Sequence, residues 1–124
     1  MAKVGASSWV AIQRNRRSGA GRQFRAIHTL ISELKRCGIA PRLFGQREEL
    51  DRTVAMAAHP PLAIVAAGGD GTVLDVLNRH QTLPVAILPL GTENLIARYY
   101  GVPKRDGEFV ARMIAADCRV PLDL

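Results

Sequence analysis

The stretch LAIVAAGGDGTVLDVL (residues 62–77) decides the fold of this 124-residue chain. Its first six residues are continuously apolar, as expected of a strand that is covered on both faces. The glycine-rich GGDGT (residues 68–72) follows, and the run from Val73 to Leu77 is amphipathic. The stretch therefore predicts a buried strand, a glycine turn and the start of a helix.

This turn has the properties of a phosphate-binding site. Glycines allow positive φ and let a ligand approach the backbone closely. The helix start adds N–H groups without intrahelical partners and the positive end of the helix dipole. Phosphate groups bind at such places, so residues 68–72 are predicted to bind one.

Strands and helices alternate along the rest of the chain. Apolar residues recur at helical spacing from Phe24 to Leu34, and Gly38 is expected to end this first helix. Pro60 and Pro61 are expected to end the second helix. This alternation predicts an α/β fold, a three-layer sandwich in which helices cover both faces of a mainly parallel sheet. The expected strands are residues 9–12, 41–44, 62–67 and 85–88, and the expected helices are residues 24–34, 48–58, 71–80, 93–100 and 109–114.

Three turns are expected at one edge of this sheet. Ligands of such folds bind beyond the carboxyl ends of the strands. Residues 15–21, 68–72 and 91–94 all follow a strand there, and all three are rich in Gly, Ser, Thr and Asn. Their convergence predicts a single site.

The charge of the chain favours anionic partners. The net charge is +6, and no acidic residue precedes Glu33. A basic front suits phosphate groups, nucleic acid or an anionic membrane surface, or is simply a solvated surface. Nucleic acid is disfavoured because the arginines lack interleaved aromatic residues and aromatic content is only 5%. The basic residues before Glu33 include Lys3, Arg14, Arg16, Arg17, Arg22 and Arg25.

Composition also limits location and metal binding. No run approaches the roughly 18 apolar residues of a transmembrane helix, and no signal peptide is recognisable. Cys37 and Cys118 make no disulfide framework, so a reducing cytoplasm is expected. His28, His59 and His80 lack metal-ligand spacing, so no metal site is assigned to them.

Two common nucleotide motifs are absent from the sequence. It contains no GxxxxGK[ST], and Gly69-Asp70-Gly71 lacks the third glycine of GxGxxG. Asp70 is the residue of interest, because a carboxylate beside a polyphosphate needs an intermediary. It can bind Mg²⁺ that bridges the phosphates or accept the proton of an attacking hydroxyl, or it can serve as a helix N-cap or turn residue.

The other polar residues of the turns also allow two interpretations. Thr72 can donate its hydroxyl to a phosphate or cap its helix, and Asn94 can bind the ligand or cap the next helix. Asn15 and Ser18 can hydrogen-bond a nucleotide or act as ordinary turn formers.

Three motifs, in order, resemble those of the diacylglycerol kinase catalytic domain family, which also includes sphingosine, ceramide and bacterial lipid kinases. NRRSGAG (residues 15–21) resembles NPxSGxG, GGDGT (residues 68–72) matches in full, and PLGTENLIAR (residues 89–98) is similar to PLGTxNDxAR. GGDGT alone is shared with NAD kinases, but GGDGT followed by PLGTxN is specific for the lipid kinase branch.

The resemblance implies the N-terminal nucleotide-binding domain of a lipid kinase. Such an enzyme transfers the γ-phosphoryl group of ATP to a lipid hydroxyl with Mg²⁺, and the aspartate of GGDGT is needed for activity. Asp70 then becomes the catalytic residue. The nucleotide-binding residues become Asn15, Ser18, Gly68, Gly69, Gly71, Thr72, Gly91, Thr92 and Asn94.

The sequence departs from the family motifs at three positions. Arg16 stands where the family usually has Pro, which loosens the first turn and adds a cation. Glu93 replaces a small residue and Leu95 stands where Asp is common. Thr92 and Asn94 are unaffected by these changes.

The resemblance also implies a second domain. Residues 1–118 are expected to form the nucleotide-binding domain, and residues 119–124 to begin the crossover to a missing, largely β domain. The chain alone is then expected to be inactive, and an unpaired edge favours self-association. It is expected to be cytoplasmic, with peripheral contact to the membrane that holds its lipid substrate. The alternatives are an NAD kinase-like domain, a non-catalytic kinase-like scaffold and a nucleic-acid module.

Overall fold

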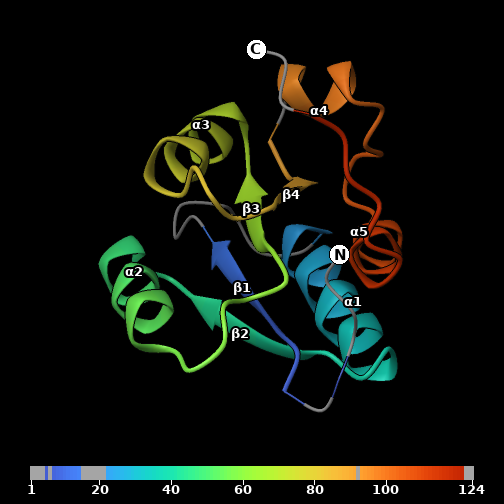
Figure 1. The fold of residues 1–124 in the computed structure, drawn as a ribbon. Helices are drawn as coiled ribbons and strands as arrows, with labels where there is room; N and C mark the ends of the chain where they lie inside the picture. The colour runs from blue at the N-terminus through green and yellow to red at the C-terminus, as the bar shows by residue number, and fades with distance from the viewer. Residues whose placement is uncertain (1–4, 6, 15–21, 92, 122–124) are drawn as a thin grey trace.

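The computed structural model describes residue 5 and residues 7–14, 22–91 and 93–121 (Figure 1). Strands and helices alternate as the sequence predicts up to the fourth strand, after which two helices follow in succession. In order, the elements are β1 (Trp9–Arg14), α1 (Arg22–Arg36), β2 (Ala40–Phe44), α2 (Arg47–Met56), β3 (Ile64–Gly68), α3 (Asp70–Arg79), β4 (Val85–Pro89), α4 (Leu95–Tyr99) and α5 (Gly107–Ala115).

The four strands form one parallel sheet in the order β2-β1-β3-β4. Arg14 pairs in register with Ala67, and Gly68 with Pro89. The carboxyl ends of β1, β3 and β4 are therefore nearly level, so the segments that leave them start close together.

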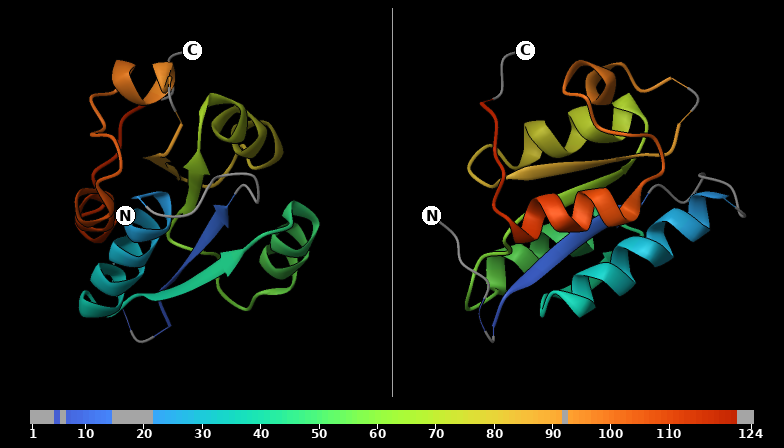
Figure 2. Two further views of the ribbon diagram at one scale, coloured as in Figure 1. Left: turned by 180° about the vertical axis from the view of Figure 1, so that it is seen from behind. Right: turned by 90° about the vertical axis from the view of Figure 1, so that its right-hand side faces the viewer.

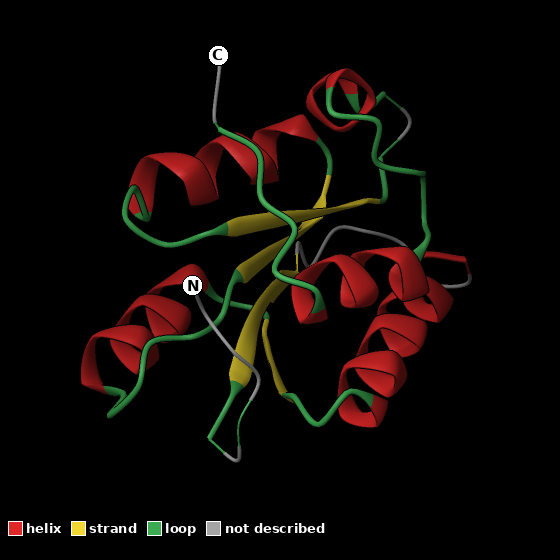
Figure 3. Cartoon of the chain, turned by 45° about the vertical axis from the view of Figure 1, so that its right-hand side comes forward, coloured by secondary structure: helices red, strands yellow, loops and turns green. Residues whose placement is uncertain are grey.

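Helices cover both faces of the sheet (Figures 1 and 3). In β1, Val10 and Ile12 pack with α1 and α5, whereas Trp9 and Ala11 pack with α2 and α3. Strand side chains alternate between faces, so both faces of β1 and β3 are buried in an apolar core. This explains the continuously apolar run of residues 62–67 and confirms the predicted three-layer α/β fold.

Two glycines fix the ends and packing of α1. Gly38 adopts φ 80°, and the N–H of Ile39 bonds to the carbonyl of Leu34 at 2.9 Å, so the predicted stop is confirmed. At the start of α5, a Cβ on Gly107 would lie 2.4 Å from the Ala26 carbonyl oxygen. The absence of a side chain at Gly107 therefore lets the two helix backbones touch, side by side in Figure 2.

The C-terminal third differs in detail from the sequence prediction. α4 is shorter than expected, because it begins at Leu95 and not at Glu93. Residues 119–121 have no regular secondary structure. No helix within the described ranges is long and apolar enough to cross a membrane.

Candidate functional site

The second and third of the expected turns meet at the carboxyl edge of the sheet. The segments after β3 and β4 run next to each other, because the N–H of Leu90 bonds to the carbonyl of Gly68 at 3.0 Å. The structure thus brings together Gly68, Gly69, Asp70, Gly71, Thr72, Gly91 and Asn94. Asn15, Ser18 and Thr92 lie outside the described residues.

Glycines allow these two turns to touch. A Cβ on Gly91 would lie 3.2 Å from the Cα of Gly69, and a Cβ on Gly68 would lie 2.6 Å from the hydroxyl oxygen of Thr72. Either added side chain would crowd the neighbouring turn or the start of α3. The positive φ that glycine allows is not used at these turns: among the described glycines, only Gly38 and Gly101 have it. Close approach is the reason for glycine here.

Asp70 links the two turns through its carboxylate. It is the first residue of α3, yet its oxygens accept the N–H groups of Leu95 and Ile96 at 2.9 and 3.1 Å. These N–H groups belong to the first turn of α4, which has no intrahelical partner for them. Of the alternatives raised by the sequence, the capping role is therefore observed, but for α4 and not for the helix to which Asp70 belongs.

The Asp70 carboxylate retains capacity for a ligand. A carboxylate has about four lone-pair sites, and the two bonds to α4 use two of them. Asp70 is also only partly buried. The capping role therefore leaves room for a chemical one.

Asn94 closes its own turn. Its side-chain amide donates to the carbonyl of Gly91 at 2.8 Å, and its side-chain oxygen accepts the N–H of Gly91 at 3.2 Å. The residue is 7% exposed, and its side chain makes no capping bond to α4. Asn94 therefore shapes the turn that precedes α4.

The start of α3 is open. The first helical hydrogen bond runs from the N–H of Val73 to the carbonyl of Gly69, at 3.2 Å. The N–H groups of Asp70, Gly71 and Thr72 precede this bond and have no intrahelical partner. A Cβ added to Gly71 would meet nothing within 4 Å, so the described residues leave open space beside this helix start.

A polar cluster that the sequence did not reveal lies beside this edge. Gln13, near the end of β1, donates to Asp75 of α3 at 3.1 Å. Arg79 and Arg47 also bind the Asp75 carboxylate, at 3.1 and 3.0 Å. Arg79 in addition contacts Gln13 and Asp51, and Asp51 bonds to His80 at 2.6 Å. The one available signal was the i,i+4 spacing of Asp75 and Arg79 on a helix.

This cluster ties α2 and α3 to β1. Burial alone would raise the pKa of Asp75, but the hydrogen bonds from Gln13 and Arg79 and the charge of Arg79 outweigh it and hold that pKa below its usual value of 3.8. The ionised carboxylate is therefore favoured in the folded chain.

The family follows from comparison with known proteins. Residues 10–124 match the diacylglycerol kinase catalytic domain. The match spans nearly the whole chain, which therefore belongs to the diacylglycerol kinase catalytic domain family.

Individual relatives agree with this assignment. The chain is 30% identical over 112 residues to a diacylglycerol kinase of Mycobacterium tuberculosis (strain H37Rv), covering 86% of the chain and 36% of that relative. It is 35% identical over 65 residues to a diacylglycerol kinase of Bacillus subtilis (strain 168), covering 49% of the chain and 22% of that relative. The chain thus spans about a third of the length of the Mycobacterium tuberculosis relative.

A solved structure has the same fold. The structure of a candidate diacylglycerol kinase from Bacillus anthracis (strain Sterne) superimposes with a TM-score of 0.64 at 24% sequence identity. The alignment covers 90% of this chain and 39% of that one. At this identity the likeness concerns the fold alone.

The polar cluster gives a pH-dependent prediction. The folded pKa of Asp75 lies below its unfolded value, so its contribution to stability is present above the unfolded pKa and is lost as the pH falls through the folded pKa. Replacing Asp75 with Asn should lower the free energy of unfolding at pH 7 by about 1–3 kcal/mol. The difference from the unmodified chain should shrink below about pH 4, as urea unfolding at several pH values can measure.

The exposed pair of Glu108 and Arg112 provides the control. Replacing Glu108 with Gln should change the free energy of unfolding by less than about 1 kcal/mol. A loss for Asp75→Asn that is equal at pH 7 and pH 3 would contradict the role given to the Asp75 charge.

Proposed function

We propose that this chain is the nucleotide-binding domain of a lipid kinase, which transfers the γ-phosphoryl group of ATP to a lipid hydroxyl. One observation carries the proposal: the Gly68–Gly69 and Gly91 turns touch, and Asp70 bonds across them to α4. Membership of the diacylglycerol kinase catalytic domain family supports the reaction class.

The start of α3 is the proposed cradle for the nucleotide phosphates. Its N–H groups without an intrahelical partner and the positive end of the helix dipole favour an anion. The open space at Gly71 lets phosphate oxygens approach the backbone. Thr72 adds a hydroxyl donor in the same helix turn, and Gly91 and Asn94 shape the opposite wall.

Asp70 is the proposed functional acid of this site. Its partly exposed carboxylate keeps lone pairs beyond those that bind α4, and carboxylate oxygens are ligands that Mg²⁺ prefers. Bound there, Mg²⁺ would neutralise charge on the phosphates. Alternatively, the same carboxylate is proposed to accept the proton that the lipid hydroxyl loses when its oxygen bonds to phosphorus and ADP leaves.

The turn at residues 15–21 belongs to the proposal through the resemblance of its motif. It follows β1, whose carboxyl end is level with those of β3 and β4. Asn15 and Ser18 are proposed to bind the nucleotide from that turn, and Thr92 from the turn before α4.

The proposal includes a second domain. Residues 1–118 form the nucleotide-binding domain, and residues 119–124 begin the connection to the other. The curated relatives support this division, because the chain covers only 36% of the Mycobacterium tuberculosis relative. The whole enzyme is proposed to work in the cytoplasm, in peripheral contact with a membrane, and the edge normally covered by the second domain favours self-association of this chain.

Nucleotide binding tests the site. Replacing Gly71 with Ala should leave the fold intact, because the added Cβ meets nothing within 4 Å and Ala is favoured over Gly in a helix. It should nevertheless weaken ADP or ATP binding with Mg²⁺ by roughly tenfold, since the methyl group occupies the phosphate approach. Thr72→Val should weaken binding by removing a hydroxyl donor while preserving shape. Isothermal titration calorimetry measures both affinities.

Matched controls lie elsewhere in the chain. Gly5 also has nothing within 4 Å of an added Cβ, and the Thr53 hydroxyl bonds within α2 to the carbonyl of Glu49. Gly5→Ala and Thr53→Val should bind nucleotide as the unmodified chain does. Unchanged affinity in both Gly71→Ala and Thr72→Val would reject the proposed phosphate cradle.

Phosphoryl transfer tests the two-domain part separately. The purified 124-residue chain should bind nucleotide yet form no labelled phospholipid from labelled ATP and detergent-dispersed diacylglycerol, because the proposed second domain would supply the other half of the cleft. Robust turnover by this chain alone would refute the need for a second domain.

A further inference from the structure

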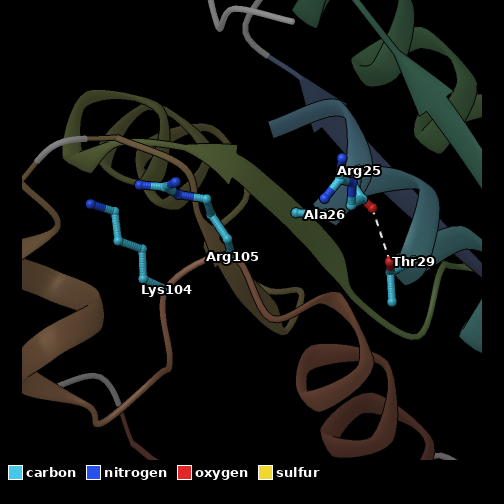
Figure 4. A pocket seen from close by; sticks show the side chains of 5 residues that line it. All are labelled: Arg25, Ala26, Thr29, Lys104 and Arg105. Atoms are coloured by element: carbon cyan, nitrogen blue, oxygen red, sulfur yellow. Dashed lines mark hydrogen bonds between the residues drawn. The ribbon is translucent and has the colours of Figure 1, made fainter. Parts of the chain in front are cut away.

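An open pocket of about 360 Å³ has no residue of the three turns in its lining. It is bounded on one side by Arg25, Ala26 and Thr29 of α1 and on the other by Lys104 and Arg105, in the turn before α5 (Figure 4). The two walls are nearly 80 positions apart in the sequence and meet only in the fold.

The pocket is basic. Three of the five residues that line it carry positive charge, and none carries negative charge. Among the described residues, no acidic side chain forms an ion pair with Arg25, Lys104 or Arg105. The neighbouring Asp106 is engaged as the N-cap of α5, accepting the N–H of Phe109 at 2.9 Å. The three cations of the pocket are therefore without an ion-pair partner among the described residues.

Arg105 is fixed in an unusual conformation at this pocket. Its φ of 55° lies in the left-handed region that non-glycine residues rarely adopt. Its N–H bonds to the carbonyl of Pro89 at 2.9 Å, which anchors the turn to the end of β4. Its side-chain Nε is buried and bonds to no described group. A buried donor without a partner is costly, and such groups usually meet a water or a ligand.

The position of the opposite wall is also fixed. Gly107 packs directly on the α1 backbone, where a Cβ would lie 2.4 Å from the Ala26 carbonyl oxygen and 2.5 Å from the Leu30 nitrogen. This close approach holds the Lys104–Arg105 turn against α1. The Thr29 hydroxyl donates to the Arg25 carbonyl at 2.9 Å, so Thr29 serves as wall and not as donor. The two segments that carry the cations are thus held together before any ligand arrives, which lowers the cost of binding.

We propose that this pocket binds a phosphate group through Arg25, Lys104 and Arg105. Guanidinium groups bind phosphate in a bidentate fashion, and an ammonium adds a mobile point charge. The group can come from a soluble phosphate compound or from the headgroup of an anionic phospholipid. The pocket shares no lining residue with the proposed nucleotide cradle, and its test does not depend on nucleotide binding.

The first experiment titrates the folded chain with inorganic phosphate. NMR resonances of the Arg105 Nε–H group and the Lys104 amide report on the pocket, whereas the Gly71 amide reports on the α3 start. The double variant Arg25→Gln/Lys104→Gln should weaken the phosphate effect at Arg105 by roughly tenfold. Arg105 itself is left unchanged because its turn is anchored to the end of β4 and because its Nε–H group is the reporter. If the double variant unfolds, Lys104→Gln alone, on an exposed side chain, replaces it.

The control variant Lys35→Gln/Arg52→Gln removes the same charge from two exposed residues outside the pocket. It should keep the affinity of the unmodified chain. An equal loss of phosphate affinity in both double variants would show that net charge alone causes the effect, and it would overturn the proposal. So would the absence of any shift at Arg105 at the highest phosphate concentration that leaves the chain folded, together with no binding in the vesicle experiment.

The second experiment distinguishes the sources of the phosphate group. Co-sedimentation compares vesicles of phosphatidylcholine with vesicles that also contain phosphatidylglycerol. A headgroup site predicts binding to the second kind alone, reduced by roughly fivefold in Arg25→Gln/Lys104→Gln and not in Lys35→Gln/Arg52→Gln. If the ligand is a soluble phosphate compound, phosphate should shift the Arg105 resonance, and vesicle binding should not depend on Arg25 and Lys104.

Discussion

The carboxylate of Asp70 is the contact on which the candidate site depends. It joins the start of α3 to the first turn of α4 by accepting the N–H groups of Leu95 and Ile96. α4 has only five residues and little intrinsic stability, so its position depends on contacts such as this one. Because the bonds are charge-assisted, they also fix how the turn before α4 lies against the glycines after β3.

The bonds from α4 to Asp70 affect how the proposed role of Asp70 as the functional acid can be tested. In this chain Asp70 has a structural role, because its carboxylate holds the first turn of α4. Changing Asp70 would therefore have two effects: removal of the proposed functional carboxylate and release of α4. Gly71 separates these effects better, because the fold needs no glycine there and the proposed phosphate does.

Much of the fold could be predicted from the sequence, because apolar runs such as residues 62–67 specify buried parallel strands locally. The meeting of the second and third turns also followed, since the carboxyl ends of parallel strands share one edge. Three long-range contacts could not be predicted. They are the bonds between Asp70 and α4, the bond from Gln13 to Asp75, and the meeting of Arg25 with the Lys104–Arg105 turn at one pocket. The residues in each contact are separated by between 25 and about 80 positions in the sequence. Strand order and helix packing decide which distant residues meet.

The role of Asp70 is tested most directly by amide hydrogen exchange. In Asp70→Ala, exchange at Leu95 and Ile96 should accelerate by roughly five- to tenfold while the β3 amides stay protected. Asp106→Ala, which removes the cap of α5, should affect Phe109 and leave Leu95 unchanged. Unaltered exchange at both Leu95 and Ile96 in Asp70→Ala would contradict the account, because the two turns would then be held together without this carboxylate.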